Sequence, residues 1–204
     1  MTQPDAGLDQ EPVAARARLL ELLLEAEAYN PGNQFVNVDR IWASPRTMEP
    51  FCHHLAEYVR ATLSLPQVTG LVTVDSVLYP FGPVPIAVQL AVQLGLPLGI
   101  WKENADPLSG AHRFYGHKPA ENGLVLYDVT RFGLTAMRAL LAMRDEGCRP
   151  RWLLTLVDCE RGAAEFLRTE TLKMSFGRFC GWPSSSTCCI GYSKARLTCP
   201  ARGR

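Results

Sequence analysis

One stretch of the chain places an acid, two hydroxyls and a glycine close together after an apolar run. Asp128 follows the apolar residues 124–127, and Thr130, Gly133 and Thr135 come shortly after it. A carboxylate can accept hydrogen bonds from sugar hydroxyls or hold a metal ion through water, and hydroxyls and loop N–H groups can bind phosphate. These residue types therefore suit a sugar phosphate. The alternative, that Asp128 only caps a turn, stays open because short motifs have weak specificity.

The residues around this stretch have the pattern of a strand, a loop and a helix. Residues 124–127 are short and β-prone, and residues 128–133 have the composition of a turn. The inward face of the expected helix, which ends at Gly147, consists of Leu134, Met137, Leu140 and Leu141. The free N–H groups and the positive dipole end of that helix would face the loop, which favours phosphate binding there.

Strands and helices alternate along most of the chain. The apolar patterns predict helices at 12–28, 44–63, 85–95, 134–146 and 163–172, and strands at 35–42, 68–74, 96–101, 124–127 and 151–157. Residues 104–118 have the composition of a surface loop or a hairpin. This order predicts an α/β fold, Rossmann-like, with a mostly parallel central sheet and helices on both faces.

Length and composition indicate one globular domain with distinct ends. The chain has 204 residues, 47% of them hydrophobic and 20% charged, with a net charge of +1. This near balance gives no strong signal for nucleic acid, and no apolar run reaches the roughly 18 residues that span a membrane. Without a basic leader, a cytoplasmic location is expected. We predict a flexible N-terminus at 1–11, a domain at 12–173 and a disordered basic tail at 174–204.

Histidines and cysteines give no clear metal site. His53 and His54 are adjacent on an expected helix, and such positions point about 100° apart, so surface histidines are expected there. Cys52, Cys148 and Cys159 are scattered and read as reduced, buried residues. The four tail cysteines lack the paired spacing of zinc sites, so the tail is either disordered or a sequence that has left its reading frame.

With these patterns in view, the chain resembles the type I phosphoribosyltransferases, most closely the orotate phosphoribosyltransferase branch. The resemblance covers roughly residues 12–170. It rests on five segments in the family's order, at 35–45, 82–97, 101–103, 124–136 and 156–162. Among these, Leu124 to Ala136 resembles the motif that binds phosphoribosyl pyrophosphate (PRPP).

The resemblance implies transfer of ribose 5-phosphate from PRPP to a nitrogenous base, with Mg²⁺ on the pyrophosphate, by a homodimer. It implies that Asp128 holds the ribose hydroxyls and contacts the metal through ligand or water, and that Lys102 acts with it in catalysis. Phosphate and PRPP contacts would come from Thr130, Arg131, Gly133, Leu134, Thr135, Ser76, Arg113 and His112. The base would lie beside Asp158, Cys159, Glu160 and Arg161.

Several residues depart from the family pattern. Tyr127 stands where the motif has a first acid, and the bulky Arg131 and Phe132 replace small residues of the phosphate loop. No lysine lies between residues 104 and 113. Cys159 stands where the relatives use an arginine to bind the carboxylate of orotate, which argues against that base. Two hypotheses follow: an active phosphoribosyltransferase for a base other than orotate, or an inactive relative that binds PRPP or a nucleotide as a regulatory or scaffolding protein.

Overall fold

The fold is built on one six-stranded sheet. The structure, a computed structural model, describes residues 13–30, 35–76, 81–103, 114–159, 161–169 and 175–178. The strands of this sheet are β3 (Gly70–Asp75), β4 (Leu98–Lys102), β5 (Phe114–Gly116), β6 (Gly123–Thr130), β7 (Pro150–Asp158) and β8 (Ser175–Arg178). Their order across the sheet is β5-β4-β3-β6-β7-β8, and all neighbours are parallel except β4 and β5. The predicted α/β class with a mostly parallel sheet is confirmed.

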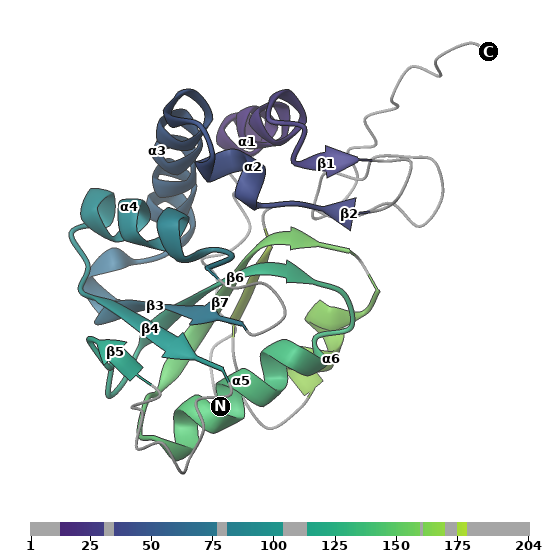
Figure 1. The fold of residues 1–204 in the computed structure, drawn as a ribbon. Coiled ribbons are helices and arrows are strands. Elements are labelled where there is room, and N and C mark those ends of the chain that lie inside the picture. The colour runs from purple at the N-terminus through teal and green to yellow at the C-terminus, as the bar shows by residue number, and fades with distance from the viewer. Residues whose placement is uncertain are drawn as a thin grey trace.

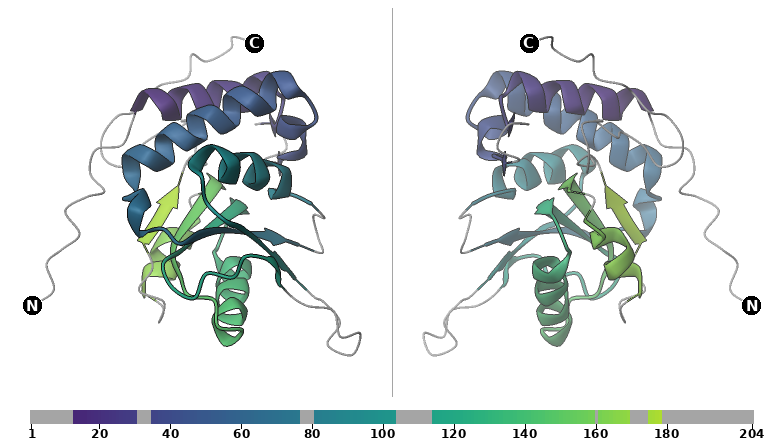
Figure 2. Two further views of the ribbon diagram at one scale, coloured as in Figure 1. Left: turned by 90° about the vertical axis from the view of Figure 1, so that its left-hand side faces the viewer. Right: turned by 90° about the vertical axis from the view of Figure 1, so that its right-hand side faces the viewer.

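Helices cover both faces of the sheet (Figure 1). One side carries α1 (Val13–Glu25), α2 (Asp39–Trp42), α3 (Pro45–Thr62) and α4 (Val84–Leu94), and the other carries α5 (Leu134–Asp145) and α6 (Ala163–Thr169). Figure 2 shows α1 and α3 stacked beyond α4, which lies against the sheet. A short 3₁₀ turn at Leu65–Gln67 leads from α3 into β3. Among the described residues, no helix combines the length and apolar character needed to cross a bilayer.

Alternate residues of the central strands fill two separate cores. Leu124 and Leu126 of β6 pack with α1, α3 and α4, whereas Val125 and Tyr127 pack with α5 and α6. The parallel strands are therefore apolar on both faces, which explains why their sequences read as continuous apolar runs. The three scattered cysteines are buried and free, as expected.

The expected strand at residues 35–42 is wrong over most of its length. Only Phe35–Val36 is a strand, β2, which pairs antiparallel with β1 (Tyr29–Asn30), and α2 follows it. The side-chain oxygen of Asn37 accepts a hydrogen bond from the Asp39 N–H at 3.0 Å. This local turn competes with extended backbone and starts the helix, because Asn readily hydrogen-bonds the backbone two residues on.

Two further expectations on the elements need correction. Strand β6 continues through Asp128 to Thr130, so the turn is only residues 131–133, because β7 keeps pairing with β6 as far as Thr130 and Asp158. In α5, Leu134 is 57% exposed and Leu141 is 43% exposed. The buried face of the helix consists of Ala136, Met137, Ala139, Leu140 and Met143, which recur at helical spacing. It therefore includes the expected Met137 and Leu140 but neither Leu134 nor Leu141.

The boundary expected at residue 173 does not match the sheet. Ser175–Arg178 forms β8, which pairs in parallel with residues 152–155 of β7. A short polar-containing edge strand carries almost no periodic signal, so its pairing depends on the neighbouring strand rather than on its own sequence. The expectations for residues 1–11, 104–113 and 179–204 lie outside the described residues.

Candidate functional site

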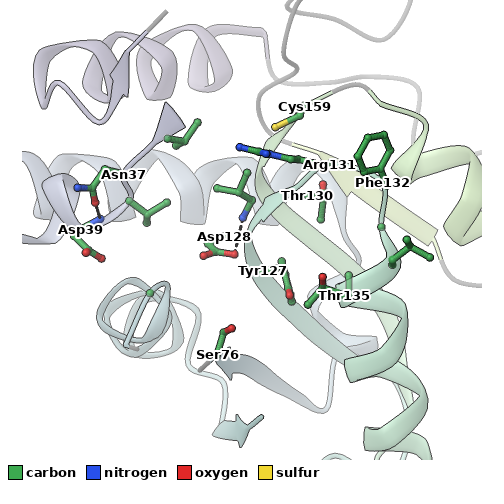
Figure 3. Close-up of a pocket in the computed structure, with 17 residues that line it drawn as sticks. Asn37, Asp39, Ser76, Tyr127, Asp128, Thr130, Arg131, Phe132, Thr135 and Cys159 are labelled. Carbon is green, nitrogen blue, oxygen red and sulfur yellow. Dashed lines mark hydrogen bonds between the residues drawn. The ribbon is translucent and has the colours of Figure 1, made fainter. Parts of the chain in front are cut away.

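A pocket of about 510 Å³ opens beyond the carboxyl ends of β6 and β7. Its lining comes from residues 36–39, 76, 82, 127–136 and 159, so the N-terminal segment before α3 and the central sheet both contribute. In a parallel α/β sheet this edge is where the loops after several strands meet, and ligands commonly bind there. Figure 3 shows the side chains of this pocket.

One end of the pocket is the N-terminus of α5. The helix begins at Leu134 after Gly133, a residue with no side chain that could cap the first N–H groups. Gly133 has a φ of 80°, and a Cβ at this residue would lie 3.2 Å from Leu167 Cγ and 3.2 Å from Phe166 Cδ1 of α6. Both the backbone conformation and the close packing favour glycine. Uncapped N–H groups in a pocket are suited to binding an anion.

Asp128 lies at the centre of the pocket, half-buried on β6. Its carboxylate accepts a hydrogen bond from the Val129 N–H at 2.7 Å. Burial raises the pKa of Asp128 above its usual value, and the negative charges of Asp39 and Glu103 act in the same direction. The hydrogen bond from Val129 partly opposes this rise. Asp128 is therefore a half-buried acceptor whose charged form would be stabilised by a ligand donating hydrogen bonds.

The two threonines expected to bind phosphate differ in their environment. The Thr130 side chain is 2% exposed, and its hydroxyl lies 3.4 Å from the hydroxyl of Thr155 on β7. Thr135, in the first turn of α5, is exposed and lines the pocket. Thr130 therefore helps to join two strands, whereas Thr135 is the hydroxyl open to a ligand.

Two polar residues of the pocket were missed by the sequence reasoning. Asn37 and Asp39 lie across the pocket from Asp128 (Figure 3). The Trp42 indole N–H donates to the Gly82 carbonyl oxygen at 3.1 Å, which joins α2, and with it Asp39, to the segment that precedes α4. The Asn-x-Asp turn was a possible signal, but the expectation of a continuous strand concealed it.

The two bulky residues of the loop have exposed side chains. Arg131 and Phe132 are both exposed, Phe132 at 55%. Figure 3 shows the Arg131 side chain extending past Cys159, away from Thr135. Tyr127 is 7% exposed at the pocket wall, and burial raises its pKa well above the usual tyrosine value, so its phenol stays neutral.

The expected base-side residues are only partly brought into the pocket. Cys159 lines it, and its backbone N–H donates to the Thr130 carbonyl oxygen at 2.8 Å. Asp158 is 1% exposed within β7, and Arg161 is an exposed residue of the following turn. Burial raises the pKa of the Cys159 thiol, whereas the charges of Arg131 and Arg161 oppose that rise. Glu160 lies outside the described residues.

Of the residues expected to bind PRPP on its pyrophosphate side, some line the pocket and others do not. Ser76, directly after β3, lines the pocket. Lys102 is exposed at the end of β4 and is not among the described lining residues. Arg113 and His112 lie outside the described residues. The structure thus brings together Asp128, the α5 N-terminus, Ser76 and Cys159, and leaves Lys102 at a neighbouring strand end.

A second polar group lies on the exposed face of α3. His54 Nδ1 is 2.8 Å from Glu57 Oε2, and His53 Nε2 is 3.5 Å from Glu57 Oε1. One ligand atom from each residue falls within 4.8 Å of the others. His53 is exposed and His54 is half-buried, in line with the surface histidines expected from the sequence, and both rings reach the Glu57 carboxylate one turn later. These contacts account for the arrangement, and none of the three residues lines the pocket.

Comparison with known proteins identifies similar sequences and folds. No family model matches the chain. The orotate phosphoribosyltransferase of Methanosarcina acetivorans is 27% identical over 135 residues, which is 66% of this chain and 67% of the relative. That of Methanopyrus kandleri is 25% identical over 173 residues, 80% of this chain and 88% of the relative.

Solved structures agree with this similarity. The orotate phosphoribosyltransferase from Aeropyrum pernix matches with a TM-score of 0.62 at 18% identity, covering 80% of this chain and 93% of that one. The Mycobacterium tuberculosis enzyme in complex with PRPP matches with a TM-score of 0.58 at 19% identity, covering 82% and 89%. The chain therefore has the type I phosphoribosyltransferase fold, and its sequence is similar to those of orotate phosphoribosyltransferases.

Proposed function

We propose that this protein binds PRPP and transfers its ribose 5-phosphate to a nitrogenous base. The observation that carries the proposal is the pocket itself, in which the half-buried carboxylate of Asp128 and the N-terminus of α5 line one cavity. A phosphate needs N–H donors and a positive dipole end, and a ribose needs an acceptor for its hydroxyls. The pocket offers both within one cavity.

The donor would bind along the loop between β6 and α5. Its 5-phosphate would accept hydrogen bonds from the N–H groups at Gly133, Leu134 and Thr135 and from the Thr135 hydroxyl. Its ribose hydroxyls would donate to Asp128. This pairing would lower the raised pKa of Asp128, because hydrogen bonds to a carboxylate favour its charged form.

In the proposed reaction the bond between ribose C1 and the pyrophosphate oxygen breaks, and a bond from C1 to a base nitrogen forms. Pyrophosphate leaves with the electron pair, and the base nitrogen loses its proton to solvent. The developing positive charge on the sugar requires a negative environment, which Asp128 and Asp39 supply on two sides of the pocket. No nucleophilic side chain is needed.

The oxygen donors of the pocket fit Mg²⁺. Asp128, Asp39 and Ser76 all line the cavity and offer the hard oxygen ligands that this ion prefers. Bound together with PRPP, Mg²⁺ would neutralise charge on the pyrophosphate. We propose that Asp128 contacts the ion through ligand or water, and that Ser76 lies on the pyrophosphate side.

A second candidate function is binding without catalysis. Tyr127, a buried neutral phenol, stands where the resembled motif has its first acid. Lys102 is not among the described residues that line the pocket. A protein of this kind would retain the phosphoribosyl ligand as a regulatory or scaffolding signal. The expectation of a base other than orotate belongs to the active hypothesis and rests on Cys159.

Turnover and binding assays separate the two functions. The full chain is incubated with Mg²⁺, PRPP and a panel of purine and pyrimidine bases that includes orotate, while pyrophosphate release is followed. Release with any base supports the transferase. A thermal shift with PRPP, without pyrophosphate release for any base, supports the binding protein. If neither a thermal shift nor pyrophosphate release is observed, both candidate functions are excluded. Light scattering of the same sample tests the homodimer that the resemblance implies.

A further inference from the structure

Helix α3 carries three side chains with metal-binding donors outside the pocket. His53, His54 and Glu57 each offer one donor atom, and the three donors lie within 4.8 Å of one another. Within the described part of the chain, no other three histidine, cysteine or carboxylate side chains gather in this way. Two imidazole nitrogens and a carboxylate oxygen form a ligand set that Zn²⁺ accepts.

The spacing along α3 explains how the three side chains meet. Glu57 comes four residues after His53 and three after His54, the two separations that make side chains neighbours on a helix. His53 presents its distal nitrogen Nε2, whereas His54 presents its proximal nitrogen Nδ1. Adjacent residues therefore reach the same place even though helical positions one apart point about 100° away from each other.

The separations between donor atoms are close to those of a zinc site. In a tetrahedral site with bonds of about 2.1 Å, neighbouring ligand atoms lie about 3.4 Å apart. The Glu57 oxygens lie 2.8 Å from His54 Nδ1 and 3.5 Å from His53 Nε2. Small side-chain rotations suffice to bring all three donors to one ion, because His53 and Glu57 are exposed and His54 is only half-buried.

The backbone beneath these donors is fixed by packing. The buried face of α3 consists of Phe51, Cys52, Leu55, Ala56, Tyr58 and Val59. Arg60, one turn after Glu57, donates to the Gln93 carbonyl oxygen at 2.6 Å, which holds its guanidinium against the end of α4. A helix anchored in this way needs little rearrangement to bind an ion through exposed side chains.

The geometry points to a Zn²⁺ site formed by His53, His54 and Glu57. Imidazole nitrogens suit zinc, whereas Mg²⁺ prefers oxygen ligands, so this site differs in chemistry from the Mg²⁺ proposed for the pocket. Three protein ligands leave a coordination position open to water or to a donor from another molecule. The ion would join side chains across one turn and stabilise the folded helix. Its binding does not depend on PRPP.

A Co²⁺ titration of the full chain, without an affinity tag, tests the site. Co²⁺ takes the place of Zn²⁺ in such sites and absorbs visible light, and accessible cysteines are first blocked with iodoacetamide so that thiols do not compete. The wild type is expected to show saturable absorption that Zn²⁺ abolishes and excess Mg²⁺ does not. His53→Gln, His54→Gln and Glu57→Gln should each lower the Co²⁺ affinity by about tenfold or more, since even changes to outer-shell partners cost that much.

The matched control is His117→Gln, at an exposed histidine outside the group, which should bind Co²⁺ like the wild type. Thermal unfolding of the same blocked proteins gives a second readout. Zn²⁺ should raise the melting temperature of the wild type and of the control, because the ion binds the folded helix. The three cluster variants should melt like the wild type without Zn²⁺ and gain nothing from it.

Three results would overturn the zinc site. The first is a wild type without saturable Co²⁺ absorption, and the second is Co²⁺ binding or a Zn²⁺-induced thermal rise that persists in all three cluster variants. The third is displacement of Co²⁺ by Mg²⁺ at similar concentrations, which would reveal a carboxylate site for hard cations. PRPP binding should be the same in the wild type and the cluster variants, so failure of the proposed function would leave these outcomes unchanged.

Discussion

Gly133 packs so closely against Leu167 that a methyl group in place of its hydrogen would lie 3.2 Å from the leucine Cγ. The contact fixes the loop before α5 to α6, which lies beyond β7 in the chain. The proposed phosphate site is therefore held from two directions, by the strand that precedes it and by a helix from later in the sequence. Its geometry depends on α6 as much as on the loop residues.

Gly133→Ala is expected to lower the free energy of unfolding by about 2–4 kcal/mol, because it combines a strained positive φ with a close contact in the core. Gly147→Ala is the matched control. Gly147 has a φ of 82° with nothing within 4 Å of a Cβ, so it should lose only about 1 kcal/mol. Urea unfolding of both variants measures the difference. Equal losses would mean that α6 yields to the methyl group and does not hold the loop.

Asp128→Asn should leave the protein without ligand at least as stable as the wild type at pH 7. The folded-state pKa of Asp128 is raised, mainly by burial, from an ordinary value of 3.8. The protonated Asp128 side chain therefore contributes fully to stability below about pH 3.8. This contribution is lost as the pH rises through the folded-state pKa of Asp128, because the half-buried carboxyl then becomes charged. Melting temperatures should accordingly favour the variant at neutral pH and converge in acid. A variant that is less stable at pH 7 would mean that the charged carboxylate is well compensated.

The same substitution is expected to weaken PRPP binding by about tenfold or more, because the amide loses the charge that strengthens hydrogen bonds from ribose hydroxyls. Calorimetry with PRPP and Mg²⁺ provides the measurement. Asp145→Asn, exposed at the end of α5, is the control for a general loss of negative charge. If Asp128→Asn binds PRPP like the wild type, the ribose is held by other residues.

Truncation before β8 should destabilise the domain. Residues 175–178 pair with 152–155 of β7, and net hydrogen-bond contributions of about 1 kcal/mol each predict a loss of about 2–4 kcal/mol. Chains that end at Met174 and at Arg178 are compared by thermal unfolding, so that only the strand differs between them. Identical melting temperatures would show that β8 adds nothing to the stability of the sheet.

Trp42→Phe is expected to lower stability by about 1–2 kcal/mol and to weaken PRPP binding. The substitution keeps an aromatic ring but removes the hydrogen bond to the Gly82 carbonyl oxygen, which joins α2 to the segment before α4. Because Asp39 and Gly82 both line the pocket, a looser junction should change binding as well as unfolding. A stability loss without any change in affinity would limit Trp42 to a structural role.

Much of the fold could be predicted from the sequence because the buried parallel strands carry strong local signals. Residues 68–74, 124–127 and 151–157 are mainly apolar runs, and the structure places residues 70–74, 124–127 and 151–157 in the sheet. The helix start at Ser44-Pro45 could also be predicted, since the Ser44 hydroxyl accepts from the Arg46 N–H at 3.3 Å. By contrast, β8 and α2 could not, because a four-residue element has too short a pattern to compete with its surroundings.

For the candidate site, the sequence by itself determined the acid at position 128 and the glycine that begins α5, because a strand, a loop and a helix form locally. Tertiary structure alone decided which residues face them. It brought Asn37 and Asp39 into the same cavity, turned Thr130 toward Thr155, and placed Arg131 beside Cys159. Those arrangements depend on how β6 and β7 pair and how α2 packs, and no short-range pattern in the chain encodes such contacts.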